Sequence, residues 1–435
     1  MADAALVQNL RTTGARPPLV RIAGADKESA PMQSEDRLGD DGGTDAGRPD
    51  VGRTDVGRPV LPPTVEDERL RALRARVRSF VRHELETGGF TPAVDSWMSA
   101  WDIGFTRRLA GQGWLGMTIP VEYGGHGRTF LERFVVTEEL LAAGAPVTAH
   151  WFADRQVAPS LLRFGTEEQK REFLPGIARG EVLFAIGMSE PESGSDLASV
   201  GTRAVRTEGG WTVTGTKVWT TNAHRADHMI ALARTAPVDA GDRHAGLSQF
   251  IVDLRSPGVE IRPIVSMDGG HHFNEVFLGD VFVPDGRVLG AIGDGWHQVT
   301  SELGFERSGP ERFLSTYLLL EDLTEAMRRG QLPADPRLGR FVARIAGLHR
   351  MSLAVAGALE RGERADVAAA VVKALGTRTE GDVAEYAAMF LGGADVPASV
   401  RDAAGAALLA RPGFTIRGGT NEILHGVIAR GLGLR

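Results

Sequence analysis

The order of apolar and polar positions divides the chain into three stretches. From about residue 62 to residue 180, apolar side chains recur at helical spacing, as at Leu70, Leu73, Val77 and Phe80. Between 181 and 290, short apolar or alternating runs are separated by Gly, Asp and Pro, which is typical of strands. Helical spacing returns from 291 to 435. These patterns predict an α+β fold, mostly α, with a helical domain, a small β domain and a second helical domain.

Individual elements can be placed within these three stretches. Helices are predicted at 101–112, 132–143, 167–178, 298–309, 313–328, 339–361, 365–391 and 420–432. Strands are predicted at 183–188, 202–207, 210–216, 228–234, 248–253 and 276–283. Gly209-Gly210 lies between two of these strands and predicts a hairpin turn. Pro310 would kink the 298–309 helix close to its end, because proline removes one helix hydrogen bond.

Residues 1–61 have a different composition and predict a flexible tail. The segment 41–59 reads DGGTDAGRPDVGRTDVGRP, with a Gly-Arg pair every five residues. Such a segment cannot bury enough apolar surface to offset the entropy lost on ordering. A docking role for the tail is the less favoured alternative.

Composition narrows the function classes. The chain has 435 residues, of which 42% are hydrophobic, and a net charge of −7. That charge gives no reason to expect nucleic acid or an anionic membrane as a partner. The absence of cysteine excludes disulfides, thiolate nucleophiles and thiolate metal ligands, and no metal site is expected. No apolar run approaches the ~18–20 residues that span a bilayer, so a cytoplasmic protein is expected.

Two loops and one helix start carry candidate chemistry. Residues 184–196 read FAIGMSEPESGSD, a strand that opens into a loop of hydroxyls and turn formers. Residues 217–222 read KVWTTN and form a second loop at the end of a strand. Residues 414–422 read FTIRGGTNE, a glycine-rich approach to a helix N-terminus, where backbone N–H groups favour anions. Each segment alone could equally be an ordinary turn or helix cap.

Taken together, four motifs resemble the acyl-CoA dehydrogenase family of flavoenzymes. They are residues 113–127 in the helical domain, the two loops at 188–196 and 215–222, and the C-terminal segment 417–423 followed by Gly431-Leu-Gly433. The motifs are in the family's order and the resemblance covers roughly residues 64–435. It implies an N-terminal helical domain at 62–180, a middle β-barrel or sandwich domain at 181–290 and a C-terminal helical bundle at 291–435.

The resemblance also implies a noncovalent FAD and an acyl thioester substrate. The residues expected at the cofactor are Met188, Ser189, Trp219, Thr221, Thr420 and Glu422. The residues expected at the substrate are Ser195, Arg307 and Arg417. Trp219 could instead be a core aromatic, Thr221 an ordinary strand hydroxyl, and Arg417 a solvated cation.

The catalytic base is where this sequence departs from many family members. They carry a glutamate immediately before the Gly-Thr of the C-terminal motif, and here that position is Gly418. In one branch the glutamate lies instead on the first helix of the C-terminal domain, which places it at Glu306, with Glu302 as the second candidate. The backbone N–H of Gly418 is expected to polarise the thioester carbonyl. The competing interpretation of Glu306 is an exposed helical ion pair with Arg307 or Arg312.

Partners and competing functions follow from the same resemblance. The expected substrate is an acyl-CoA or a carrier-protein acyl thioester, and the expected electron acceptor is an electron-transferring flavoprotein. The family's usual Arg-x-x-Phe-Gly element after the first C-terminal helix is not found here, so a homodimer, a homotetramer or a complex with a sister subunit stay open. A flavin oxidase or monooxygenase on the same fold and a non-catalytic partner subunit are the competing functions.

Overall fold

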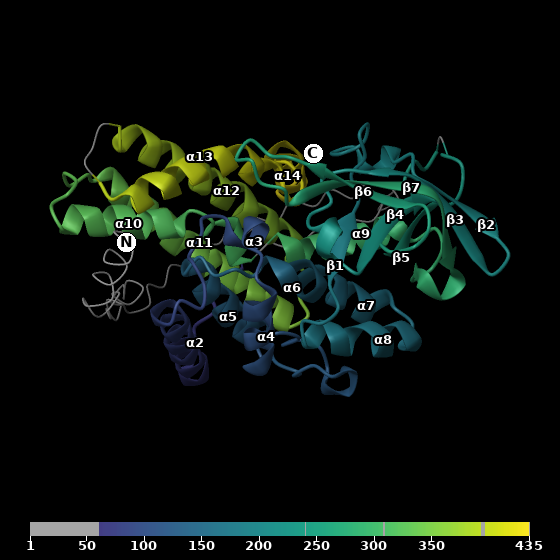
Figure 1. Ribbon diagram of the computed structural model, residues 1–435, viewed down its shortest axis with the longest axis horizontal. Helices are drawn as coiled ribbons and strands as arrows, with labels where there is room; N and C mark the ends of the chain where they lie inside the picture. Colours follow the sequence, from purple (N-terminus) through teal and green to yellow (C-terminus); the bar gives the residue numbers. More distant parts are fainter. Residues whose placement is uncertain (1–60, 240, 308, 393–395, 435) are drawn as a thin grey trace, which may run out of the picture. The chain divides into compact units, whose positions relative to one another are not determined.

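The computed structural model describes residues 61–239, 241–307, 309–392 and 396–434, apart from the side chains of residues 302–306. The predicted tail therefore lies outside the described residues, except for Leu61. Across the described ranges, no helix combines the length and the apolarity that crossing a bilayer requires. Figure 1 shows helices at the start and end of this part of the chain and strands between them, which confirms the predicted fold class.

The first stretch is helical, as predicted. Its helices are α2 (Glu68–Glu86), α3 (Ser96–Ser99), α4 (Ile103–Gly111), α5 (Phe130–Ala142), α6 (Thr148–Phe152), α7 (Ala158–Phe164) and α8 (Glu167–Ala178), with a π-helical turn η2 (Ala153–Val157) between α6 and α7. Helix α2 begins where the Asp67 side chain accepts a hydrogen bond from the Leu70 N–H at 2.8 Å. Helix α5 begins with a reciprocal cap between Thr129 and Glu132. The apolar pattern of the sequence did not predict α6, η2 or α7.

The strands form one eight-stranded sheet. They are β1 (Phe184–Gly187), β2 (Arg203–Thr207), β3 (Gly210–Lys217), β4 (His228–Arg234), β5 (Leu247–Asp253), β6 (Val259–Ile264), β7 (Phe273–Pro284) and β8 (Val288–Leu289). The order is β6-β7-β3-β2-β4-β5-β8, and β1 pairs in parallel with β4. Thr207 pairs with Gly210, which confirms the hairpin turn predicted at Gly209-Gly210. Strand β6 was not predicted, because its exposed residues break the apolar pattern.

The last stretch returns to helices. They are α9 (Gly295–Glu306), α10 (Tyr317–Arg328), α11 (Arg337–Glu360), α12 (Asp366–Phe390), α13 (Ala398–Ile416) and α14 (Asn421–Gly431). The predicted helix 298–309 is too long at its C-terminal end: α9 ends at Glu306, and Pro310 opens a separate 3₁₀ turn, η6 (Pro310–Arg312). A proline at the first position of a turn needs no N–H donor, so the chain breaks the helix there instead of bending it.

Packing fixes α9 between the sheet and the N-terminal helices. Val299 of α9 packs with Leu232 and Leu247 of the sheet. The buried Gln298 side chain donates to the Leu289 carbonyl at 2.9 Å. On the other side, the Phe164 ring of α7 meets the His297 ring edge-on at 5.6 Å. The first half of α9 is therefore held by the sheet and by α7, and Glu306 is the last residue of this helix.

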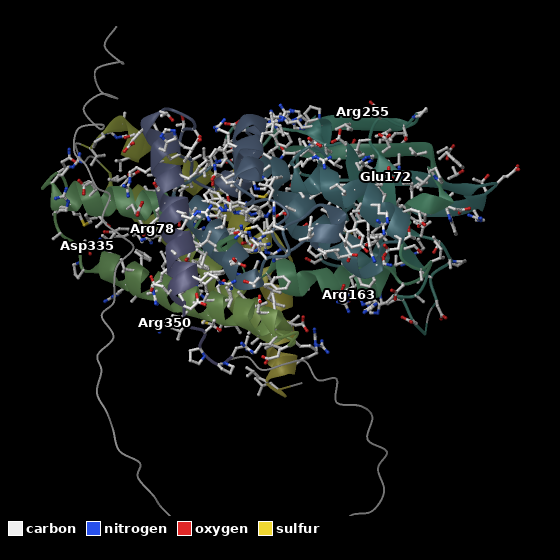
Figure 2. The ribbon with its side chains drawn as sticks, turned by 90° about the horizontal axis from the view of Figure 1, so that it is seen from below. Arg78, Arg163, Glu172, Arg255, Asp335 and Arg350 are labelled. Carbon is white, nitrogen blue, oxygen red and sulfur yellow. The ribbon has the colours of Figure 1, made fainter. Side chains whose placement is uncertain are left out.

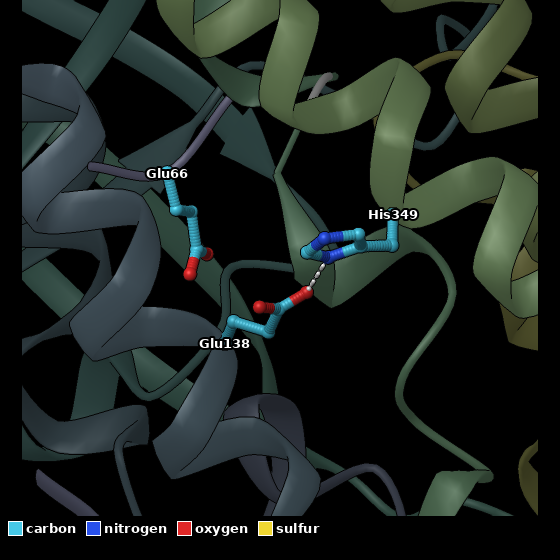
Figure 3. A group of neighbouring side chains, drawn as sticks. All are labelled: Glu66, Glu138 and His349. Carbon is cyan, nitrogen blue, oxygen red and sulfur yellow. Dashed lines mark hydrogen bonds and ion pairs between the residues drawn. The ribbon is translucent and has the colours of Figure 1, made fainter. Parts of the chain in front are cut away.

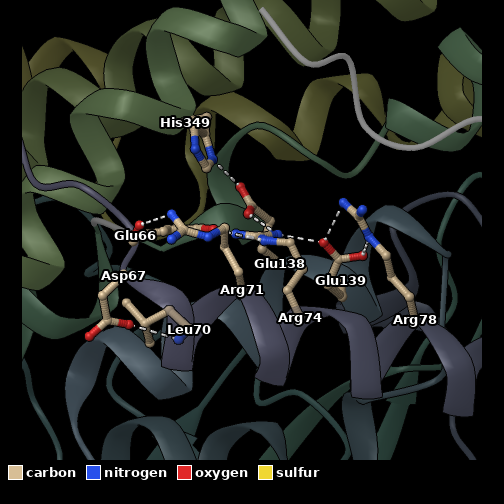
Figure 4. A network of polar contacts seen from close by, with 9 residues as sticks. All are labelled: Glu66, Asp67, Leu70, Arg71, Arg74, Arg78, Glu138, Glu139 and His349. Atoms are coloured by element: carbon tan, nitrogen blue, oxygen red, sulfur yellow. Dashed lines mark hydrogen bonds and ion pairs between the residues drawn. The ribbon is translucent and has the colours of Figure 1, made fainter.

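A buried charge network joins α2 and α5 to α11. We call it the Arg74 network, and its members are Glu66, Arg74, Arg78, Glu138, Glu139 and His349 (Figure 4). Arg74 bonds Glu66 and Glu139, and its Nη1 makes an ion-pair contact of 2.8 Å with Glu138 Oε2. His349 Nδ1 lies 2.5 Å from Glu138 Oε1. Every carboxylate of the network lies within ion-pair distance of a cation.

Three members of the Arg74 network could also face a metal ion. Glu66, Glu138 and His349 offer one ligand atom each within 4.8 Å of one another (Figure 3). The Arg74 guanidinium already bonds two of these side chains and supplies the positive charge that an ion would bring. The geometry therefore favours a structural ion network over a metal site.

Candidate active site

The two predicted loops are tied together by a buried ion pair. Lys217 ends β3 with its side chain fully buried, and its Nζ donates to Glu190 Oε1 at 2.7 Å and to the Met188 carbonyl at 3.2 Å. Glu190 also accepts the backbone N–H of Gly201 at 2.6 Å and of Thr202 at 3.0 Å. Burial lowers the pKa of Lys217 to about 8, against the opposing effect of Glu190. Three donors around one carboxylate make this junction a rigid base for both loops.

The first loop is held by hydrogen bonds to the second loop and to Arg243. The Ser189 carbonyl accepts the Val218 N–H of the second loop at 2.9 Å, and the half-buried Met188 packs against the sheet core. Asp196 accepts bonds of 2.7 Å from Arg243. Ser195, a predicted substrate residue, is exposed at the loop tip. The loop therefore presents Ser195 outward while Met188 and Ser189 stay next to the second loop.

The second loop presents a tryptophan in an unusual conformation. Trp219 has φ 59°, the left-handed region that bulky residues avoid, and its side chain is 57% exposed. Its ring meets Phe273 edge-on at 5.6 Å. Next to it, Thr221 is buried, and Thr220 buries a hydroxyl that has no hydrogen-bond partner among the described residues. A strained, exposed indole beside an unpaired buried hydroxyl is an arrangement that a flat polar ligand would complete.

The glycine pair of the C-terminal segment is held by two cations. Gly418 has φ 68° and Gly419 φ 85°, so both need the left-handed freedom of glycine. Arg307 Nε donates to the Gly418 carbonyl at 3.0 Å, and a Cβ at Gly419 would come 3.0 Å from Arg307 Nη2. The fully buried Lys373 donates to the Gly419 carbonyl at 2.8 Å. Arg307 follows Glu306 directly, so this bond ties the end of α9 to the glycine pair.

The last helix begins at the predicted cofactor residues. The Thr420 side chain caps α14 by accepting the Ile423 N–H at 3.4 Å. Glu422 lies in the first turn of α14, where its own backbone N–H and the Thr420 hydroxyl lower its pKa. Glu306, the predicted base, is the last residue of α9, and its side chain and that of Glu302 lie outside the described part. Their role as base stays a prediction.

Arg417, a predicted substrate residue, pairs with an acid of the N-terminal domain. Its guanidinium bonds Asp95 at 2.8 to 3.1 Å and lies over the Trp97 ring at 4.8 Å. Asp95 has φ 54°, so the backbone is held in the left-handed region to make this bond. Arg417 is thus neither a solvated cation nor a cation without a counter-charge.

The Arg417–Asp95 pair belongs to a larger buried group that we call the Arg417 network. Its members are Asp95, Trp97, Arg155, Glu311, Arg312, Ser315, Glu380 and Arg417. Ser315 links its halves, since its N–H donates to Glu380 Oε1 at 2.7 Å and its hydroxyl accepts the Trp97 indole N–H at 3.2 Å. Glu311 lies 3.6 Å from Arg155. The network connects α3, η2, η6 and α12 and ends one residue from Gly418.

A shallow surface hollow adjoins one residue of this network. It has about 10 Å³ of cavity volume and is lined by Arg155, Gln156, Pro159, Ser160, Arg163, Phe164 and Ser301. Arg163 is exposed, and Figure 2 labels it among the surface side chains. Ser301 belongs to α9, the helix that ends at Glu306. Arg155 lines the hollow and also lies 3.6 Å from Glu311, so the hollow adjoins the Arg417 network.

Comparison with known proteins identifies the family. Three family models match in order: the acyl-CoA dehydrogenase N-terminal domain at residues 67–181, the middle domain at 185–281 and the C-terminal domain at 334–433. The chain belongs to the acyl-CoA dehydrogenase family. This membership confirms the resemblance on which the predicted cofactor and substrate residues depend, while the position of the catalytic glutamate remains a prediction.

Curated acyl-CoA dehydrogenases of Mycobacterium tuberculosis are among the similar sequences. FadE34 is 38% identical over 329 residues, which are 74% of this chain and 45% of FadE34. IpdE1 is 37% identical over 341 residues, which are 76% of this chain and 87% of IpdE1. The chain therefore spans less than half the length of FadE34 but most of IpdE1.

Solved structures share the fold. The Tcur3481-Tcur3483 steroid ACAD has a TM-score of 0.75 at 30% identity, over 85% of this chain and 99% of that chain. A chain of the ChsE4-ChsE5 complex from Mycobacterium tuberculosis has a TM-score of 0.71 at 28% identity, over 86% of this chain and 100% of that chain. The similarity thus covers at least 85% of this chain.

The described residues fit the FAD on which the family depends. Trp219 offers a bare aromatic face, and the unpaired Thr220 hydroxyl and Asn222 amide offer polar contacts beside it. The positive φ values at Gly418 and Gly419 keep side chains away from the start of α14. Aromatic faces and unpaired polar groups are what a heterocycle with a polar edge requires.

Sequence reasoning missed Asp95, Trp97, Glu311 and Glu380. None belongs to a family motif, and Asp95 is separated from Arg417 by 322 residues along the chain. One signal in the sequence could have indicated this network. Arg417 is a cation next to the expected thioester position, and a buried cation requires an acid nearby.

Proposed function

We propose that the chain is an FAD-dependent dehydrogenase of acyl-CoA or another acyl thioester, which forms a 2,3-enoyl thioester. The observation that carries this proposal is the bond from Arg307 to Gly418, because it ties the helix that ends at Glu306 to the position expected for the thioester carbonyl. The linked flavin loops with the exposed Trp219 support the same conclusion. An intact flavin site beside a relocated glutamate argues for a catalytic chain.

The residues of this chain take separate parts in the proposed reaction. The Glu306 carboxylate removes the α-proton of the acyl group, a step for which a positioned base contributes typically 10²–10⁴-fold in rate. The Gly418 N–H donates to the thioester oxygen and stabilises the negative charge that develops there. FAD, when bound, supplies the acceptor for the β-hydride. Arg307 positions Gly418, because its guanidinium bonds the carbonyl of Gly418 while the N–H of the same residue is left for the thioester oxygen.

Cofactor binding falls to the two loops and to α14. Met188, Ser189, Trp219 and Thr221 hold the ring system. Thr420 and Glu422 contact the cofactor from the start of α14, where free backbone N–H groups favour its polar parts. The junction of Lys217 with Glu190 keeps both loops in register before the cofactor binds.

The assembly and the electron acceptor are proposals of the same kind. One similar solved structure is the ChsE4-ChsE5 complex, and another carries the double name Tcur3481-Tcur3483. Both support pairing of this chain with a second copy or a sister subunit. The C-terminal helices expose large apolar side chains that an interface would cover: Leu375, Met389, Leu408, Leu409, Ile416 and Ile423. An electron-transferring flavoprotein is the proposed acceptor.

The test is reduction of bound flavin by acyl-CoAs in the absence of oxygen. We expect loss of flavin colour with the wild type, at least a hundredfold slower loss with Glu306→Gln and little change with Glu302→Gln, since one base removes the proton. Equal rates for wild type and Glu306→Gln would exclude Glu306 as the base. A purified chain that is colourless and inert would instead indicate a partner subunit, and rapid oxygen consumption without an added acceptor would indicate an oxidase.

A further inference from the structure

The Arg417 network buries several charged side chains in one place. Glu311, Arg312 and Glu380 are 3%, 2% and 1% exposed, and Asp95 and Arg155 are also buried. Moving a charge from water into the protein interior costs several kcal/mol unless the charge is paired and hydrogen-bonded. A network that served only to hold helices together would therefore be expected to pair all of its atoms.

Three buried atoms of the network have no hydrogen bond among the described residues, and two of them, on Glu380 and Arg417, also make no ion-pair contact, whereas Glu311 Oε2 lies 3.6 Å from Arg155. Glu380 Oε1 accepts the Ser315 N–H, but Glu380 Oε2 has no hydrogen bond and no ion pair among the described residues. Arg417 Nε is likewise buried without a partner, while the two terminal nitrogens of its guanidinium bond Asp95. An unmet acceptor and an unmet donor in one buried group provide the two contacts that an oxygen-bearing ligand needs.

The network also lies where an acyl group would be. Arg417 immediately precedes Gly418, the residue proposed at the thioester carbonyl, and Trp97 lies beneath the Arg417 guanidinium. Glu380 belongs to the same cluster, because Ser315 bonds both Glu380 and the Trp97 indole over which the Arg417 guanidinium lies. An acyl chain leaving the thioester on this side would meet aromatic and charged groups in place of a purely apolar wall.

We propose that Glu380 and Arg417 form a recognition site for an uncharged oxygen function, a hydroxyl or a ketone, on the acyl group of the substrate. Glu380 Oε2 accepts from a hydroxyl or, when the carboxyl is protonated, donates to a ketone. Arg417 Nε donates to the same oxygen. This inference rests on the proposed dehydrogenation and adds its substrate class.

The charges of the network favour an uncharged group over a carboxylate. Asp95 already neutralises Arg417, and Glu311 lies beside Arg155 and Arg312. A substrate carboxylate would therefore add a negative charge next to two carboxyl groups, Asp95 and Glu380. Burial raises the pKa of Glu380 to about 7, so near neutral pH the carboxyl is present in both forms and can accept or donate.

The experiment compares acyl-CoAs matched in length on the flavin-loaded full chain. The panel holds hydrocarbon chains, chains with a hydroxyl or ketone at successive positions, and chains that end in a carboxylate. We expect the best oxygen-bearing thioester to exceed the matched hydrocarbon about tenfold to a hundredfold in kcat/KM, and the carboxylate to be the poorest. Calorimetric affinities for the corresponding enoyl-CoA products should follow the same order.

Three variants separate recognition from folding. Glu380→Leu should erase the preference for the oxygen-bearing chain, since leucine offers neither an acceptor nor a donor to the substrate oxygen. Glu380→Gln should retain most of the preference, because an amide both donates and accepts. Glu385→Leu is the control on the same helix, since Glu385 pairs with Arg411 at the surface and should change neither rate.

Each outcome bears on one proposal. If the wild type oxidises hydrocarbon and oxygen-bearing chains equally well, the proposed recognition site is contradicted, but the proposed dehydrogenase activity is not. If Glu380→Leu preserves the preference, the site is likewise wrong. If no thioester of the panel reduces the flavin and none binds, the dehydrogenase proposal itself fails. Should Glu380→Leu not fold, the Glu380→Gln preference and the product affinities decide.

Discussion

The two buried charge networks of this protein differ in how completely they are paired. In the Arg74 network, every carboxylate lies within ion-pair distance of Arg74, Arg78 or His349. In the Arg417 network, Glu380 has no ion pair among the described residues and one of its oxygens has no bond at all. Both networks join N-terminal to C-terminal helices, so their positions alone do not distinguish them.

The difference indicates two kinds of purpose. A buried pair contributes little net stability compared with apolar residues, but removing one partner is costly because the other charge remains. Complete pairing therefore marks a joint that holds elements in place. Incomplete pairing next to Gly418 marks a site that is completed by something outside the chain.

The largest effect is expected on breaking the Arg74 network. Arg74→Met leaves the buried Glu138 and Glu139 and the half-buried Glu66 without their shared cation and should lower the free energy of unfolding by about 3–5 kcal/mol. Urea unfolding followed by circular dichroism measures it. Arg71→Met is the control on the same helix, because Arg71 pairs with Glu68 at the surface and should cost less than about 1 kcal/mol. Similar losses for both variants would contradict a structural role for the network.

The next prediction compares one substitution in the two networks. Glu138→Gln removes the charge that faces Arg74 and His349 and should cost about 2–3 kcal/mol. Glu380→Gln retains the bond from the Ser315 N–H and should stay within about 1 kcal/mol of the wild type. The same urea titration serves for both. A larger loss for Glu380→Gln than for Glu138→Gln would reverse the assignment of the two networks.

A smaller effect depends on pH. Burial lowers the pKa of His349, but the bond to Glu138 outweighs burial and the pKa is raised, with Arg74 opposing and Glu66 assisting. A raised folded-state pKa gives stability that is complete below pH 6.5 and is lost as pH rises through the folded value. The melting temperature of the wild type should therefore fall over that range more than that of His349→Gln. Parallel curves would show that His349 is not charged in the folded protein.

The smallest effect on stability is expected in the two loops proposed to bind the flavin, at 188–196 and 217–222. Trp219→Asn replaces an exposed indole by a residue that tolerates positive φ, so the free energy of unfolding should change by less than about 1 kcal/mol. The affinity for FAD should fall several-fold, as equilibrium dialysis would show, because the aromatic face is lost. A stable variant with unchanged FAD affinity would remove Trp219 from the cofactor site.

The sequence predicted what depends on local pattern and on family motifs. The helical and β stretches follow from periodicity, and the two loops follow from residues close together in the chain, as Met188 and Lys217 are. Helix α13 (Ala398–Ile416) was missed because its many alanines and its Pro412 leave no clear apolar period. The Arg417 network was missed because Asp95 and Glu380 come from separate domains, and nothing in their own neighbourhoods shows that they will be buried together.

The conformation of Trp219 has a practical consequence for spectroscopy. Of the seven tryptophans, Trp219 alone is exposed, and Trp97, Trp114, Trp151 and Trp211 are buried. Its emission should be shifted to the red of theirs, because its indole faces water. If the proposed flavin site at Trp219 is correct, FAD should quench the red edge of the fluorescence, which would report cofactor loading on the unmodified protein.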